Sequence, residues 1–282
     1  MSVGKRQGDK ETRRQGEGRR ARISLSPCLP LSLSVFLLTS FVTVSAAERW
    51  VDTRQVGPFV CQASFPLAEG ESVLAELKGL ESELIRTLGI DPAREPIYIY
   101  LFSNEMAHWA YVAKHFPGVP WRRALFVREG GLAGVYAYRH KQLDVDLRHE
   151  CTHAVLHASL PYVPLWLDEG LAKYFEVPED QRAFDHPYFG DLRWNLRVGM
   201  IQNIDALESR REITDMGASE YRDAWAWVHF MFHGPTGGHA ALVQYLADVR
   251  RGAMAGRLSE RLAGSVPDPP AQMVEHFKHW RR

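Results

Sequence analysis

One short motif carries the clearest chemistry in this sequence. Residues 149–153 read His-Glu-Cys-Thr-His, an H-E-x-x-H pattern, and Glu169 follows His153 after sixteen positions. On a helix, residues four apart lie on one face, so both imidazoles can point at a single ion. A catalytic zinc takes three protein ligands of this kind and keeps a fourth position for water. We therefore predict a Zn²⁺ site formed by His149, His153 and Glu169.

Glu150 is the predicted catalytic base. It lies about 100° round the helix from His149, close enough to take a proton from a water molecule on the ion without being a ligand. A carboxylate in that position can pass the proton to a leaving nitrogen. The motif thus predicts metal-assisted hydrolysis of an amide bond, with a peptide or protein as the substrate. The alternative is a pair of surface histidines with no ion.

Two helices must bring these groups together. After the motif the chain is apolar, then turn-like, with Pro161 and Pro164 as helix breakers. Pro164 suits the first turn of a second helix, which can run back beside the first and present Glu169 to the histidines. Asp168 is predicted either to orient a ligand histidine or to act as a helix-start carboxylate.

Other histidines and a cysteine near these segments have simpler interpretations. His157 lies about 12 Å along the axis from His149, too far to share the ion. His229 and His233 are also four apart, at a helix end, where packing and capping are favoured over a second metal site. Cys151 is expected to face away from the metal as a buried packing residue. A disulfide between Cys151 and Cys61 is the alternative.

The stretch from His149 to Tyr174 resembles a known family pattern. H-E-x-x-H followed by W-L-x-E-G-x-A is similar to the gluzincin zinc peptidases, which include thermolysin and a group of aminopeptidases. It is most similar to bacterial secreted proteins with a peptidase-MA-like domain, and weaker resemblance extends from Pro96 to His233. The G-x-M-E-N strand of the aminopeptidases is absent. So is the metzincin extension, since Leu156 and Ser159 occupy its positions.

The resemblance implies a fold and two further roles. It implies a thermolysin-like catalytic core in which His149, His153 and Glu169 are the ligands and Glu150 is the base. It also implies a tyrosine that donates to the oxyanion, for which Tyr221 is the candidate. The alternative for Tyr221 is a residue packed at a helix start.

The remaining pattern predicts an α+β fold with a C-terminal all-helical lobe. Strands are expected over residues 96–102, 124–127, 133–138 and 142–145, in a small mixed or antiparallel sheet. The strand beside the metal helix is either the edge that receives the substrate backbone or an ordinary meander strand. Helices are expected over residues 69–88, 103–115, 219–233, 239–249 and 271–280, with a short one within 200–208.

The N-terminal residues differ in character from the rest. Residues 1–22 are basic, and residues 23–47 are uncharged with an apolar centre and a small-residue end. This predicts a secretory signal peptide over residues 1–47, and so a secreted or periplasmic protein. The alternative is an uncleaved anchor that would hold the chain at a membrane.

The charge balance excludes nucleic acid as a partner. Residues 1–47 hold eight basic and three acidic side chains, which leaves 26 basic and 31 acidic ones in the rest. That remainder therefore lacks the excess of basic residues that binds nucleic acid. We expect an N-terminal α/β lobe over residues 48–146, and the zinc helices with a helical lobe over residues 147–282, together one catalytic domain. The alternative function is a non-catalytic zinc-containing binding or assembly module of the cell envelope.

Overall fold

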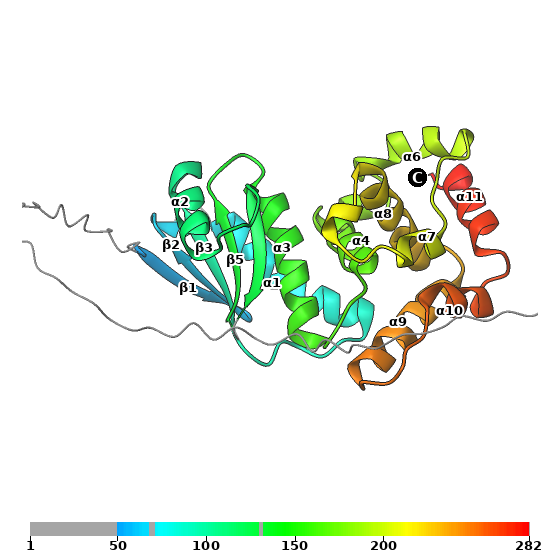
Figure 1. The fold of residues 1–282 in the computed structure, drawn as a ribbon, viewed down its shortest axis with the longest axis horizontal. Coiled ribbons are helices and arrows are strands. Elements are labelled where there is room, and N and C mark those ends of the chain that lie inside the picture. The colour runs from blue at the N-terminus through cyan, green and yellow to red at the C-terminus, as the bar shows by residue number, and fades with distance from the viewer. Residues whose placement is uncertain (1–49, 68–70, 130–131, 282) are drawn as a thin grey trace, which may run out of the picture. The chain divides into compact units, whose positions relative to one another are not determined.

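The computed structural model describes residues 50–67, 71–129 and 132–281, which belong to one compact unit. The predicted signal segment, residues 1–47, lies outside the described residues. Within the described ranges no helix is both long and apolar enough to cross a bilayer. The described fold is α+β, with one open five-stranded mixed sheet and eleven α-helices (Figure 1).

The sheet consists of two hairpins on either side of a central strand. Its strands are β1 (Asp52–Val56), β2 (Phe59–Ala63), β3 (Ile97–Phe102), β4 (Ala124–Glu129) and β5 (Leu132–Tyr138). Their order is β1-β2-β3-β5-β4. The central strand β3 runs parallel to β2 and β5, and each hairpin is antiparallel. Strand β4 is therefore an edge strand, with one row of backbone groups not paired to β5.

Helices cover both faces of this sheet. Alternate residues of β2 and β3, such as Cys61 and Ile99, are buried in one large core with α1 (Glu71–Leu88) and α3 (Leu143–Ser159). The opposite face carries Phe102, Tyr136 and Tyr138 in a smaller cluster beneath α2 (Glu105–His115). Alternation with period two explains why β3, β4 and β5 each contribute residues to both clusters.

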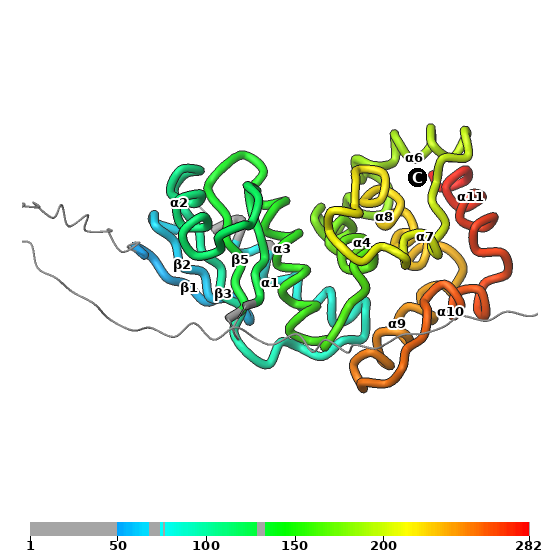
Figure 2. The backbone as a smooth tube through the Cα atoms, in the orientation of Figure 1, coloured from blue at the N-terminus to red at the C-terminus, as the bar shows by residue number. Residues whose placement is uncertain are grey.

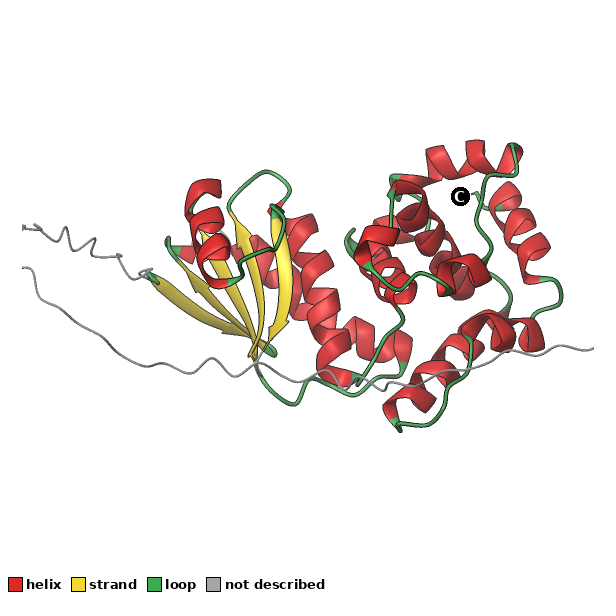
Figure 3. Ribbon diagram, in the orientation of Figure 1, coloured by secondary structure: helices red, strands yellow, loops and turns green. Residues whose placement is uncertain are grey.

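From α4 onward the described chain is helical apart from connections (Figure 3). Figure 2 shows the chain leaving α3 and passing through a short connection into α4. The remaining helices are α4 (Leu165–Phe175), α5 (Glu179–Arg182), α6 (Tyr188–Arg197), α7 (Ile204–Glu208), α8 (Ala218–His233), α9 (Thr236–Arg250), α10 (Leu258–Ser265) and α11 (Pro269–His279). A 3₁₀ turn occupies Ile213–Asp215.

Helix α4 is buried on nearly all sides. It packs against α3 and, more extensively, against α8. Gly170 makes the second contact possible, because a Cβ there would lie 2.8 Å from the carbonyl oxygen of Ala224 on α8. The residues on either side of Gly170 are buried too. The position of α4 is thus fixed from both sides.

One predicted strand is wrong. Residues 142–145 form no strand; Gln142 is the N-cap of α3 and Leu143 begins the helix. Leu143 and Val145 alternate with Asp144 and Asp146, which imitates a strand. In the structure Asp144 and Asp146 lie in the first helical turn, where the helix dipole favours negative charge.

The other predicted strands and the long helices are confirmed within a few residues. The core of the helical part includes Trp225, Trp227, Phe230 and Tyr245, all buried as expected. Helices α5, α6 and α10 were not predicted, since residues 177–197 and 258–265 are polar and lack a long apolar stripe.

Candidate metal centre

Two helices supply the predicted metal ligands. His149 and His153 project from α3 on the side away from the sheet, and Glu169 projects from α4. The face of α3 that carries Leu143, Leu147 and Cys151 is buried in the core with the sheet. Helical periodicity therefore turns the histidines toward α4. The structure brings all three predicted ligands together as a group that could hold a metal ion.

The three ligand atoms form a nearly regular triangle. Nε2 of His149 lies 3.3 Å from Nε2 of His153, and Oε2 of Glu169 lies 3.6 Å and 3.7 Å from these two atoms. A point equidistant from all three lies about 2.0 Å from each, which is the length of a bond from a divalent ion to nitrogen or oxygen. Two imidazoles with one carboxylate suit several first-row metals, zinc among them.

A carboxylate lies behind each ligand histidine. Nδ1 of His149 is 3.0 Å from Oε2 of Glu176, and Nδ1 of His153 is 3.0 Å from Oδ1 of Asp168. Ionised carboxylates only accept hydrogen bonds, so each Nδ1 carries a hydrogen, and each Nε2 offers a lone pair once its imidazole is neutral. When both rings are neutral the two lone pairs face each other, an arrangement that a cation between them stabilises.

Charges around the group shift its pKa values. Burial disfavours the charge on His153, but Asp168, Glu169 and Glu150 outweigh burial and raise its pKa to about 10. Burial likewise opposes the charge on Glu176, but the hydrogen bond with His149 and the charge of Lys173 lower its pKa to about 2. These shifts mean that the cluster attracts positive charge, whether as protons or as a metal ion.

No model of a known protein family matches the chain, and no curated protein matches it.

Glu150 lies between the metal group and the sheet edge. Its Oε2 accepts a hydrogen bond of 2.7 Å from the backbone N–H of Phe126 on β4. This bond fixes one carboxylate oxygen, while Oε1 has no partner within the described ranges. The same contact shows that the N–H of Phe126 points away from β5. The open side of β4 therefore runs past Glu150.

Tyr221 lies in the first turn of α8. The Lys173 Nζ atom lies 6.0 Å from the centroid of its ring. Burial and the nearby charge of Glu169 raise the pKa of Tyr221, while Arg122 and Lys173 partly offset them. The hydroxyl therefore stays protonated at neutral pH and can donate. Tyr221 also packs against the main core, so both predicted roles are compatible with its position.

A cavity of about 350 Å³ opens beside the metal group. His149 and Glu150 form one part of its wall, and Lys173 and Glu176 form another. The third wall is the segment that leads into β4, from Trp121 to Ala124. A ligand in this space would touch the predicted base and the sheet edge together.

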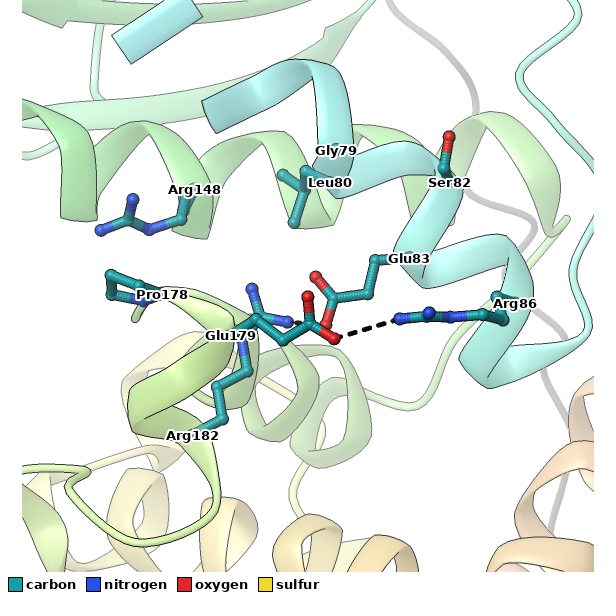
Figure 4. A pocket seen from close by; sticks show the side chains of 9 residues that line it. All are labelled: Gly79, Leu80, Ser82, Glu83, Arg86, Arg148, Pro178, Glu179 and Arg182. Atoms are coloured by element: carbon teal, nitrogen blue, oxygen red, sulfur yellow. Dashed lines mark hydrogen bonds and ion pairs between the residues drawn. The ribbon is translucent and has the colours of Figure 1, made fainter. Parts of the chain in front are cut away.

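A larger cavity of about 460 Å³ lies behind the metal helix, between α1, α3 and α5 (Figure 4). Its charges are paired with one another: Arg182 with Glu83, and Arg86 with Glu179 at 3.2 Å. Arg148 donates from Nε to the carbonyl oxygen of Glu176 at 2.7 Å. Arg148 thus helps to position Glu176, the residue that holds His149.

His157, His229 and His233 contact protein groups other than the three predicted ligands. His157 Nε2 lies 2.9 Å from Oδ2 of Asp168, so it is satisfied at the helix end as predicted. His229 contacts His276 at 3.1 Å, and His233 contacts the hydroxyl of Tyr174 at 2.8 Å. These contacts agree with the packing interpretation.

The cysteine prediction is confirmed in part. Cys151 is fully buried in the core and faces away from the ligands. Both Cys61 and Cys151 carry free thiols in the structure. Burial raises the pKa of Cys61 to about 12, so this thiol is unreactive.

Sequence reasoning missed Glu176 and Lys173. Both lie on the face of α4 that carries Glu169, at spacings of four and seven residues. Lys173 Nζ is 2.8 Å from Glu176 Oε2. The i, i+4, i+7 spacing of Glu169, Lys173 and Glu176 was the available signal. Asp168 was predicted either to orient a ligand histidine or to start a helix, and both hold: it lies 3.0 Å from His153 and in the first turn of α4.

Proposed function

We propose that this protein is a zinc-dependent peptidase with a gluzincin-like, thermolysin-like catalytic core. One observation carries the proposal. Two imidazole Nε2 atoms and a carboxylate oxygen converge to 3.3–3.7 Å of one another, and Glu150 lines the cavity beside them. A three-ligand site with a neighbouring carboxylate base supplies what metal-assisted hydrolysis of an amide uses.

The metal would be held by His149, His153 and Glu169. When bound, a divalent zinc supplies Lewis-acid polarisation of the scissile carbonyl and acidifies water. Asp168 and Glu176 keep the two imidazoles in the tautomer and orientation needed for binding. The pattern H-E-x-x-H with W-L-x-E-G-x-A, on which the resemblance to gluzincins rests, falls on these residues.

Glu150 would move the proton. Its Oε2 is tied to the N–H of Phe126, which leaves Oε1 to take a proton from the attacking water and return it to the departing nitrogen. The open side of β4 offers backbone groups with which an extended substrate can pair. Tyr221, protonated and beside Glu169, would donate a hydrogen bond to the developing oxyanion.

Export forms part of the proposal. Residues 1–47 have the composition of a secretory signal peptide, and the proposed peptidase would act in the periplasm or outside the cell.

The test is metal-dependent cleavage of a mixed peptide library by the purified protein. We expect cleavage with added Zn²⁺, none with a chelator, and recovery when the ion is restored. The isosteric variant Glu150→Gln is the matched control, because it should bind the ion without cleaving. Absence of cleavage by metal-loaded protein under every condition would favour the non-catalytic zinc-binding module.

A further inference from the structure

One cationic side chain in the wall of the cavity beside the metal group, that of Arg122, has no carboxylate partner among the described residues. Its wall carries the cationic side chains Arg122, Arg123 and Lys173. Arg123 is hydrogen-bonded to Gln142, and its NH2 atom lies 2.9 Å from Oδ1 of Asp146. Lys173 is paired with Glu176. Among the described residues, no carboxylate is paired with Arg122.

Each carboxylate that lines the cavity already has a hydrogen-bond or ion-pair partner. Asp146 is paired with Arg123 and lies 3.1 Å from Nε2 of His140. Glu176 is shared by Lys173 and His149. Glu150 accepts from a backbone N–H and is the proposed base. A further negative group that enters the cavity therefore finds Arg122 as its available partner.

Arg122 is exposed, so its guanidinium can reach a group that enters the cavity. Trp121, 49% exposed, adds an apolar wall beside it. A planar guanidinium pairs bidentately with a carboxylate, which is the anionic group that a peptide carries.

The position of Arg122 indicates where on the substrate that carboxylate would lie. Arg122 lies just before the start of β4, at the N-terminal end of the open edge. Antiparallel pairs of strands outnumber parallel ones in protein sheets. A substrate strand that pairs with β4 in this way would extend its C-terminal part toward Arg122.

We propose that the substrate carries a carboxylate on the C-terminal side of the scissile bond, bound by Arg122. This inference rests on the proposed peptidase function. The carboxylate belongs either to an Asp or Glu side chain or to the end of the substrate chain. Both sources present the same group to Arg122.

Matched peptides separate these sources. One pair differs only in Glu against Gln next to the scissile bond on its C-terminal side, and a second pair ends there in a free acid or an amide. Wild-type protein should cleave the acidic member of one pair with kcat/KM about ten-fold higher. In Arg122→Gln that ratio should fall to about one. Arg86→Gln, which removes an exposed arginine of the other cavity, should keep the ratio.

A binding measurement keeps the inference testable without turnover. Two pairs of peptide hydroxamates, one with Glu against Gln and one with a terminal acid against an amide, are titrated calorimetrically into zinc-loaded protein. The acidic compound of one pair should bind wild type about ten-fold more tightly than its neutral partner, and Arg122→Gln should bind both members of that pair equally tightly.

The outcomes for the two proposals differ. Equal cleavage and equal binding of acidic and neutral members by wild type would overturn the inference and leave the peptidase in place. A preference that survives in Arg122→Gln would also overturn it. Tighter binding of the acidic hydroxamate with no cleavage of any peptide would support the carboxylate site and reject the peptidase. If no hydroxamate binds to the zinc-loaded wild-type protein, both proposals fail.

Discussion

The two ligand histidines are held in different ways. His149 is backed by Glu176, whose charge is also bound by Lys173. His153 is backed by Asp168, which it shares with His157. Both carboxylates are largely buried, and their pKa values are lowered despite burial, because the neighbouring cations and hydrogen bonds dominate. Each stays ionised at neutral pH and therefore positions an imidazole without competing for the ion.

The first prediction concerns these positioning carboxylates. Glu176→Gln and Asp168→Asn should each weaken metal affinity by about 10–100-fold, because a neutral amide orients and polarises the imidazole less well. Competition against a chromophoric chelator measures the effect. Glu179→Gln, an exposed acid near Glu176 in sequence, is the control and should bind metal like wild type. Unchanged affinity in both variants would contradict the assigned role.

Glu150 is predicted to matter for chemistry alone. Glu150→Gln should keep full metal content but lose about 10²–10⁴-fold in kcat, since proton transfer is removed. The amide oxygen can still accept from the N–H of Phe126, so the local structure should persist. Metal analysis beside peptide cleavage tests both halves. Retained activity would show that another group moves the proton.

Tyr221 can be tested in the same assay. Tyr221→Phe removes one donor and should lower kcat by about 10–10³-fold, with metal affinity unchanged. If the residue only packs at the start of α8, the variant would instead cleave normally. Thermal unfolding of the variant detects any loss of packing separately.

At the scale of elements, α4 decides whether the site forms. It presents Glu169 to α3 while its opposite side lies against α8 at Gly170. A Cβ at Gly170 would meet the backbone of Ala224, at 2.8 Å from O and 3.0 Å from C, and Val228 Cγ2 at 3.0 Å. Backbone cannot give way as a flexible side chain can.

Gly170→Ala should therefore push α4 off α8 and disturb the metal group. We expect a loss of about 1–3 kcal/mol in the free energy of unfolding, together with weaker metal binding. Gly190→Ala is the matched control, because a Cβ at Gly190 in α6 would meet nothing within 4 Å, and alanine favours helix there. Equal stability of the two variants would refute tight packing at Gly170.

Much of this arrangement could be predicted from the sequence, and the reasons differ by element. The spacing of four residues on a helix predicted the histidine pair. The two prolines predicted the chain reversal that brings Glu169 close to these histidines. The strand at residues 142–145 failed because four residues of alternation cannot outweigh a helix that continues through Leu147. Glu176 was missed because its role depends on where α4 ends against α3, which is a tertiary contact.

At the scale of the molecule, the metal group joins two kinds of structure. Helix α3 packs on the sheet, and α4 packs within the helical part, so the ligands come from both sides of one junction. Metal bound to the folded chain alone should raise its stability by about 4 kcal/mol at a free concentration of about 1,000 times Kd. Unfolding followed with and without chelator should show this difference, and Glu169→Ala should abolish it.

Without metal, the same junction should respond to pH. The pKa of His153 is raised to about 10 in the folded chain, and that of His149 is raised as well. A raised folded pKa stabilises the protein fully below the unfolded value of about 6.5, and the stabilisation is lost as pH rises toward about 10. Buried His108, His186, His233 and His276 have pKa values lowered to about 4, so they stay neutral in this window.

Metal affinity should change in the opposite direction over that window. Binding needs both imidazoles neutral, so the ion displaces protons and its affinity rises as pH increases. Urea unfolding in chelator between about pH 6.5 and 10, beside metal titrations at the same pH values, measures both slopes. His153→Gln should flatten the stability slope, because the group that releases the proton is gone. If metal-free stability stayed constant across the window in wild type, the carboxylates around His153 would not be holding a proton there, and the cluster would lack the cation affinity on which the metal site depends.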